Sequence, residues 1–321
     1  MTNHATPQGD SNNALPLPGL DGANPLGFLA ALGVFRVLTN APEVAPVRMK
    51  WTPSKGTLVP AIRGSSEQAL NQDALLRVVC KGLANDIAKH PAQLLDVLGN
   101  AIDDENKRRR VFLDQFDQTA GNDRTLADWL AALASDFAPA DAINQLQTTR
   151  RDYYFGTLAS VIKETKIDHL CRSIFHPWDY ADPLDNQSLH LDPGEDRRHA
   201  HQWNKPAGDL DRKKSGGMLG ANRLAIEAIP LFTSFPEDGG LRTVGFTGNR
   251  STNTRWTWPL WSIDIALPVV RSLLLLPELQ GDPPNPAEIA MLRERGIVAI
   301  YRTNRILVGK TPNFTPTRRI A

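Results

Sequence analysis

A proline-rich stretch from His176 to Asp196 separates two parts of this chain that have different sequence patterns. It reads HPWDYADPLDNQSLHLDPGED, and its three prolines and several Asx residues predict that regular helices and strands stop there. Before it, from about 68 to 165, apolar residues recur at helical spacing, whereas short helical and β-compatible runs alternate after it. This order predicts an α+β fold with a helical middle region, mixed β segments in the C-terminal half and a C-terminal hairpin.

The same separation suggests a domain organisation. We expect a mobile tail over residues 1–14, a mainly helical N-terminal lobe over 15–168, and an α+β lobe over 169–321 with a long irregular central stretch. A chain of 321 residues, 41% of them hydrophobic, is long enough to bury a sizeable core. The two lobes can therefore also form one continuous domain.

Local signals place the N-terminal elements. Asn24 followed by Pro25 matches an N-cap and a first helical position, so a helix should begin there and continue through FLAALGVFRVL. Small residues between Gly27 and Gly33 leave one side on which another backbone can approach closely. Residues 49–62 are β-compatible but interrupted by prolines, which indicates edge strands or a hairpin with irregular ends.

The C-terminal half carries similar signals. ANRLAIEAI predicts a short helix that stops at Pro230, and NPAEIAMLRERG predicts another. Near the end, GIVAIYRTNRILVGKTP contains two β-branched runs around RTNR. This pattern predicts a hairpin with Thr303 and Asn304 at the bend.

Charge and cysteine content restrict the class of protein. The formal net charge is +1, so any attraction to nucleic acid has to come from a local patch. Cys80 and Cys171 lie far apart without a C-x-x-C partner, which excludes a thiolate zinc cluster and favours a reducing, cytoplasmic setting. The start lacks the basic and apolar regions of a signal peptide, and no apolar run is long enough to cross a bilayer. We therefore expect no membrane partner.

Metal-dependent catalysis is one interpretation of the central stretch. Hard oxygen and imidazole ligands lie close together in sequence there: Asp185, His190, Asp192, Glu195, Asp196, His199 and His201. A metal-dependent nuclease would use Asp192, Glu195, Asp196 and His199. Their spacing matches neither an H-E-x-x-H motif nor an EF-hand, so the pattern does not identify a metal site.

Phosphate binding is the interpretation that we favour for this stretch. Cations that can hold phosphates are Arg197, Arg198, Arg212, Lys213 and Lys214. The segment SGGMLGAN, with Gly216, Gly217 and Asn222 before Arg223, predicts backbone N–H groups at a helix N-terminus. The alternative is that Arg197 and Arg198 pair with Glu195 and Asp196 and hold a loop.

The region from Arg242 onward has a basic bias, with eleven lysines and arginines against five acidic residues. Arg250 and Arg255 flank a tryptophan-rich run that could stack bases, although tryptophans at this density more often fill a core. No Walker loop, nucleophile elbow, dinucleotide-binding glycine motif or kinase signature is present in the sequence. We expect no cofactor and no catalytic residues.

Two blocks resemble proteins encoded in type I-G (formerly I-U) CRISPR loci. The blocks are LPGLDGANPLGFLAALGVFRVL, and DPLDNQSLHLDPGEDRRHAHQWNKPAGD with GANRLAIEAIPLF. They are similar to the family that extends the CRISPR helicase-nuclease and, more loosely, to the large-subunit-like proteins of those loci. The resemblance covers the first forty residues and roughly 176–280.

The resemblance implies a role in a prokaryotic antiviral effector complex, with crRNA, target DNA or other effector subunits as partners. The chain has none of the helicase motifs or the His/Asp nuclease motif of the helicase-nuclease, which argues against independent unwinding or cutting. The leading hypothesis is an accessory or structural subunit. The alternatives are a metal-dependent nuclease and a protein-docking adaptor without nucleic-acid binding.

Overall fold

A computed structural model describes residues 14–64, 70–84, 114, 117–118, 122–133, 144–149, 151–184, 187–195, 216–237, 240–248, 254–282, 285–308 and 311–321. The first elements are β1 (Leu15–Pro16), α1 (Pro25–Thr39), β2 (Arg48–Ser54), β3 (Thr57–Arg63), α2 (Gln72–Ala84), α5 (Arg124–Leu133), α6 (Arg151–Glu164) and α7 (Ile167–Phe175). After them come α8 (Leu219–Ala228), β4 (Ser234–Glu237), β5 (Gly240–Thr243), β6 (Phe246–Thr247), β7 (Thr254–Trp261), α9 (Leu267–Leu274), α10 (Pro286–Glu294), β8 (Ile297–Val308), β9 (Thr311–Phe314) and β10 (Arg318–Arg319). The predicted α+β class is confirmed. Residues 1–13 of the tail predicted over 1–14, and parts of the predicted helical region, 85–113 and 134–143, lie outside the described residues.

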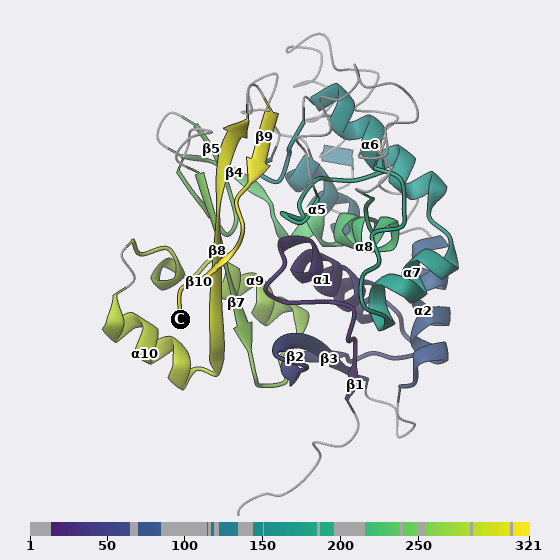
Figure 1. Cartoon of the computed structure of the whole chain (residues 1–321), viewed down its shortest axis with the longest axis horizontal. Coiled ribbons are helices and arrows are strands. Elements are labelled where there is room, and N and C mark those ends of the chain that lie inside the picture. The colour runs from purple at the N-terminus through teal and green to yellow at the C-terminus, as the bar shows by residue number, and fades with distance from the viewer. Residues whose placement is uncertain are drawn as a thin grey trace, which may run out of the picture.

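Helix α1 lies between the sheets and a group of helices that includes α7 and α8, and its first turn follows the sequence prediction (Figure 1). The Asn24 Oδ1 atom accepts hydrogen bonds from the backbone N–H groups of Leu26 and Gly27, at 2.9 and 3.3 Å. A Cβ atom added at Gly33 would lie 1.8 Å from the carbonyl oxygen of Leu224, so α1 and α8 approach closely there. The small side of α1 is therefore the side against which α8 packs.

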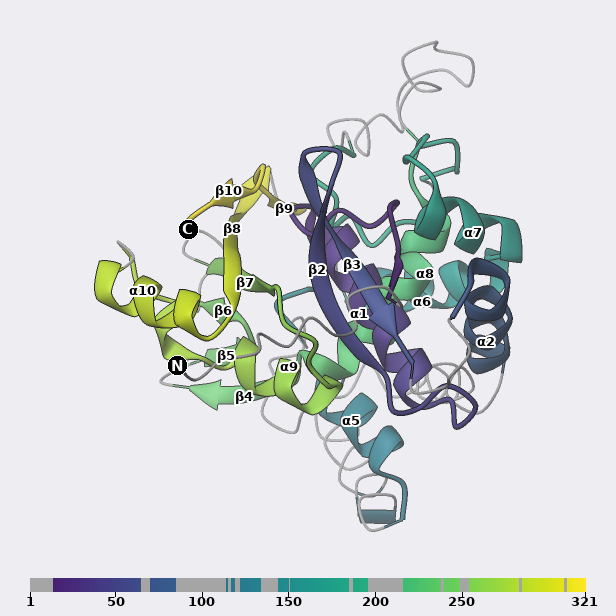
Figure 2. The ribbon, with the colours of Figure 1, turned by 90° about the horizontal axis from the view of Figure 1, so that it is seen from below.

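Antiparallel sheets lie on the other side of α1. The predicted hairpin over 49–62 is confirmed as β2 and β3, which turn at Lys55 and Gly56, and β1 adds to β3. The larger sheet has the strand order β10-β8-β7-β6, with β9 also paired to β8. An isolated bridge between Met49 and Ile265 joins the two regions, and Figure 2 shows β2 and β3 beside α1 from below.

The C-terminal hairpin exists, but its predicted bend was wrong. Strand β8 continues through Thr303 and Asn304, which pair with Trp256 and Arg255 of β7. The hairpin is formed instead by β8 and β9, from the pair Val308 and Thr311 onward. The local RTNR signal did not break the strand because β7 supplies a partner along most of its length.

Aromatic side chains form the centre of the core. Trp256, Trp258 and Trp261 are fully buried, and Phe28 of α1 stacks on Trp258 with ring centroids 5.6 Å apart. The Nε1 of Trp258 donates a hydrogen bond to the Gly22 carbonyl at 2.9 Å. These tryptophans are therefore core residues, and they are not accessible for the stacking of bases.

Buried apolar side chains from both predicted lobes pack into one continuous cluster, which includes Leu29 of α1, Leu130 of α5, Leu224 of α8 and Ile300 of β8. In the part of the chain that the structure describes, none of the helices has the length and apolar character needed to cross a membrane.

Candidate functional site

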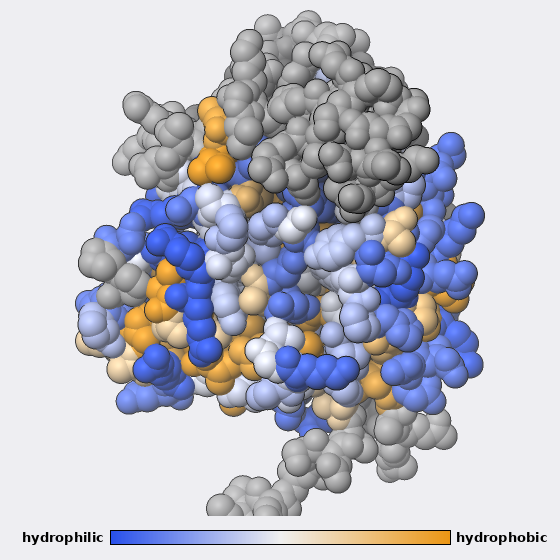
Figure 3. Space-filling view, viewed as in Figure 1, coloured by the Kyte–Doolittle hydropathy of each residue, from blue (hydrophilic) through white to orange (hydrophobic). Residues whose placement is uncertain are grey.

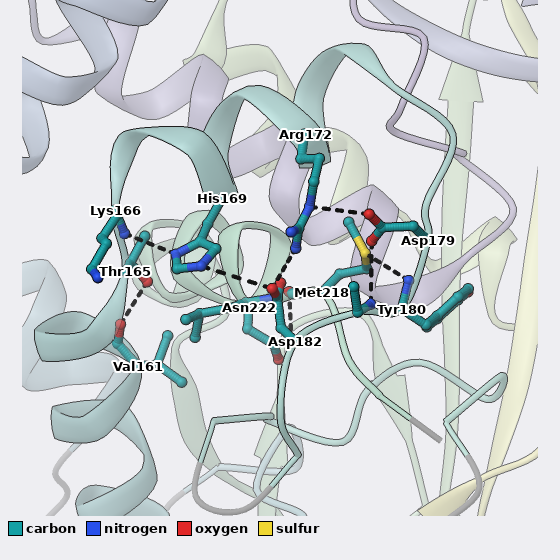
Figure 4. A network of polar contacts seen from close by, with 12 residues as sticks. Val161, Thr165, Lys166, His169, Arg172, Asp179, Tyr180, Asp182, Met218 and Asn222 are labelled. Atoms are coloured by element: carbon teal, nitrogen blue, oxygen red, sulfur yellow. Dashed lines mark hydrogen bonds and ion pairs between the residues drawn. The ribbon is translucent and has the colours of Figure 1, made fainter. Parts of the chain in front are cut away.

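The sequence-predicted binding region is built around the carboxylate of Asp182. Its Oδ2 accepts a hydrogen bond from the backbone N–H of Leu219 at 2.7 Å, at the first residue of α8. Arg172 of α7 donates to its Oδ1, and the Nε2 of His169 lies 3.8 Å from the same oxygen (Figure 4). Asp182 also exchanges two backbone hydrogen bonds with Gly217. An internal carboxylate therefore occupies the anion position at the N-terminus of α8.

This arrangement gives Gly216 and Gly217 contacts within the protein. The N–H of Gly217 donates to the carbonyl of Asp182 at 2.7 Å, so it does not face a ligand. A Cβ atom at Gly216 would lie 1.8 Å from the carbonyl oxygen of Tyr180. The glycine at 216 is required by this close backbone approach.

Asn222 and Arg223 are buried, and this also differs from the expectation. The Oδ1 of Asn222 accepts from the backbone N–H of Leu189 at 2.7 Å, and its Nδ2 donates to the Met218 carbonyl at 3.0 Å. The side chain of Arg223 is 3% exposed and donates to Glu227 Oε1 at 2.8 Å. A phosphate ligand requires an accessible guanidinium, so Arg223 serves the core of the protein instead.

Two of the four predicted metal ligands have structural partners. The Oδ1 of Asp192 accepts from Asn24 Nδ2 at 3.0 Å and from the Gly194 N–H at 2.7 Å, and its Oδ2 accepts from the hydroxyl of Tyr180 at 2.9 Å. Glu195 accepts from the hydroxyl of Ser188. The other two predicted ligands, Asp196 and His199, lie outside the described residues, as do Asp185 and His201.

Burial affects the protonation of two groups in this cluster, Asp192 and Tyr180. It raises the pKa of Asp192, and the hydrogen bond from the Gly194 N–H counteracts that effect in part. Burial also raises the pKa of Tyr180, with a further contribution from the negative charge of Asp192. Among the described residues, no group of three or more histidine, cysteine, aspartate or glutamate side chains is arranged to hold a metal ion.

The two ends of the basic central segment lie next to each other. A Cβ atom added at Gly217 would lie 3.3 Å from the Oε1 of Glu195. The cations predicted to hold phosphates lie between these ends and outside the described residues: Arg197, Arg198, Arg212, Lys213 and Lys214. Glu195 and Gly217, which stand on either side of this segment in the sequence, therefore lie beside the Asp182 and Asp192 networks.

Arg250 lies outside the described residues, whereas Arg255 is on β7 and forms an ion pair with Asp282. The sequence analysis did not identify two other arginines on the same sheet as Arg255. Arg302 and Arg318 lie on neighbouring strands, and only the basic bias of the C-terminal region indicated them. The sequence analysis also missed Asp182, because the helix that this residue caps begins far along the chain, at Leu219.

Comparisons of the chain with protein-family models, curated proteins and solved structures found no match.

Proposed function

We propose that the protein is an accessory subunit of a type I-G CRISPR antiviral effector, which binds the phosphate backbone of crRNA or target DNA and contacts other effector subunits. The resemblance of its N-terminal and central blocks to proteins of those loci supports the assignment to this system. The proposal places binding, and no chemical step, on residues 196–215.

The observation that carries the proposal is the proximity of Glu195 and Gly217. Between them the sequence has six lysines and arginines against three aspartates. Both ends are held by buried hydrogen bonds, from Ser188 to Glu195 and between Gly217 and Asp182. The residues on both sides of this positively charged segment are therefore held at one place in the fold, and an excess of positive charge suits contact with a polyanion.

The hydrogen bonds of Asp192 favour this proposal over a nuclease. A catalytic metal requires carboxylate oxygens that are free to coordinate it. Both oxygens of Asp192 already accept hydrogen bonds from protein donors, and Asn24 joins this carboxylate to the start of α1. Asp192 thus stabilises the loop, whereas only one oxygen of Glu195, Oε2, accepts a hydrogen bond in the described structure.

The test is a binding titration against single-stranded RNA, single-stranded DNA and duplex DNA at two salt concentrations, with and without Mg²⁺. The variant carries Arg197→Ala and Arg198→Ala, and the control is Arg77→Ala on the exposed side of α2. Loss of two phosphate contacts should reduce the salt slope for single strands by about 1.4, which corresponds to a loss of affinity of about 25-fold at 0.1 M salt. Sequence preference should not change.

Each other outcome contradicts a stated part of the proposal. Equal affinity of the folded double variant and wild type would remove Arg197 and Arg198 from the binding surface. Mg²⁺-dependent cleavage, lost in Asp196→Ala, would assign a nuclease instead. If no nucleic acid binds, but a partner subunit co-purifies after nuclease treatment and high salt, the protein is a docking adaptor.

A further inference from the structure

A second group of cations lies on one face of the larger sheet. Arg302 of β8 is directly opposite Arg318 of β10, and it is also opposite Thr257 of β7, two residues from Arg255. Directly opposite residues of antiparallel strands share a face, and residues two apart on one strand do so as well. The side chains of Arg255, Arg302 and Arg318 therefore project from the same face, which we call the arginine face.

One acidic residue partly neutralises the arginine face. The Oδ1 atom of Asp282 lies 3.4 Å from the Nη1 atom of Arg302, and its Oδ2 atom forms an ion pair with Arg255. Three positive charges thus meet one negative charge among these residues. Burial lowers the pKa of Arg302, the nearby positive charge of Arg255 adds to this effect, and the negative charge of Asp282 opposes it.

The three arginines have different roles. Arg302 is buried, and it donates to the hydroxyl of Thr257 at 2.9 Å and to the carbonyls of Leu279 and Gly281 at 3.1 and 2.9 Å. Its guanidinium is therefore held in place and supplies a fixed charge. Arg318 is exposed, and in the described part of the chain it has neither a side-chain hydrogen bond nor an ion pair.

Arg255 is more exposed than Arg302 and less exposed than Arg318. Its side chain is 27% exposed, and its Nε atom is buried without a hydrogen-bond partner in the described structure. Its acidic partner Asp282 is 51% exposed, so solvent screens that pair and an incoming anion can compete for the guanidinium. Figure 3 shows strongly hydrophilic side chains next to apolar ones around β10 and the neighbouring part of β8.

We propose that the arginine face is a second contact site for the phosphate backbone of the nucleic acid, with Arg255 and Arg318 as the phosphate ligands. This inference rests on the proposed function, because it names a further surface for the same partner. A guanidinium fork matches two phosphate oxygens, and Asp282 occupies part of that fork in the absence of nucleic acid. Asp282 therefore weakens phosphate binding, and Arg302 positions the site by its fixed charge.

The test compares affinities for a mixed-sequence single-stranded DNA. Arg318→Ala should reduce the salt slope by about 0.7, a loss of affinity of about fivefold at 0.1 M salt. Asp282→Asn should increase affinity. The matched controls, Arg77→Ala and Asp73→Asn, change the net charge equally on the exposed part of α2, which Figures 1 and 2 place across the molecule from β10. Arg77→Ala should reduce the affinity less than Arg318→Ala does, and Asp73→Asn should increase it less than Asp282→Asn does.

The outcomes separate this inference from the proposed function. If Arg318→Ala and Asp282→Asn behave as their controls while Arg197→Ala/Arg198→Ala weakens binding, the arginine face is not a contact site and the proposed function stands. If only the arginine-face variants change affinity, the contact belongs to this face and not to residues 196–215. A wild type that binds no nucleic acid contradicts both. Competition by polyglutamate as strong as that by polyphosphate would assign an acidic protein as the ligand.

Discussion

Asp182 closes the N-terminus of α8 through a 2.7 Å hydrogen bond from the backbone N–H of Leu219 to its Oδ2. The two residues are far apart in sequence, and the same carboxylate pairs with Arg172 of α7. One side chain thus holds the start of a buried helix, a neighbouring helix and the proline-rich loop together.

Asp182→Ala should reduce the free energy of unfolding by about 1 kcal/mol or more, because α8 loses its cap. Asp179→Ala is the control, since Asp179 lies 3.4 Å from the same arginine but is more exposed. That variant should cost less than about 1 kcal/mol. Urea denaturation of both variants checks the prediction, and equal losses would show that the helix cap contributes nothing beyond the pair with Arg172.

Glu227→Gln should be strongly destabilising. Glu227 is buried between Arg36 of α1, at 3.1 Å, and Arg223 of α8, at 2.8 Å. Removal of its charge leaves two buried guanidinium groups without compensation, for which we expect a loss of about 3–5 kcal/mol. Glu164→Gln, in the exposed pair with Lys163, should change the free energy of unfolding by less than about 1 kcal/mol. A small effect at Glu227 in thermal and urea unfolding would show that water reaches the two arginines.

The stability of the protein should depend on pH through Asp192. Burial raises its folded pKa above the ordinary value of 3.8, so the folded state holds the proton more tightly than the unfolded chain. This contribution is fully present below the unfolded pKa and is lost as the pH rises through the folded pKa. Relative to Asp192→Asn, the wild type should lose free energy of unfolding as the pH rises above the ordinary pKa of 3.8.

Tyr180→Phe provides a second measurement of the same group. The hydroxyl of Tyr180 donates to Asp192, and that hydrogen bond lowers the pKa of the carboxyl. Its removal should shift the loss of stability to higher pH. If the free energies of unfolding of the wild type and Asp192→Asn differ by the same amount at every pH, the pKa of Asp192 is not raised.

Gly216→Ala should destabilise the protein, because the new Cβ would lie 1.8 Å from the Tyr180 carbonyl oxygen and the loop would have to move. Gly156→Ala is the matched control. Gly156 is exposed within α6, and an added Cβ there meets no atom within 4 Å, so alanine should stabilise the helix by about 0.5–1 kcal/mol. Opposite changes in melting temperature confirm the prediction; a neutral Gly216→Ala would show that the loop adjusts without cost.

Signals that act within a few residues predicted the local elements correctly. Asn24 and Pro25 start α1, the run over 49–62 forms a hairpin, and Asn285 accepts from the N–H of Ala287 at the start of α10. Caps and turns depend on neighbours in sequence, so their signals can be read without the fold. The α+β class followed from the helical spacing of apolar residues in the middle of the chain and the β-compatible runs after it.

Tertiary structure decided which polar residues are accessible. Arg223 and Asn222 resemble a binding surface in sequence, but Glu227 and the backbone at Leu189 enclose them. Strand β8 passes through the predicted bend at Asn304 because β7 pairs with it. Arg255 and Arg318 share one face of the sheet only because β7, β8 and β10 pair in this register. These outcomes depend on partners far away in sequence, and the free energy of a buried charge or a paired strand depends on such partners.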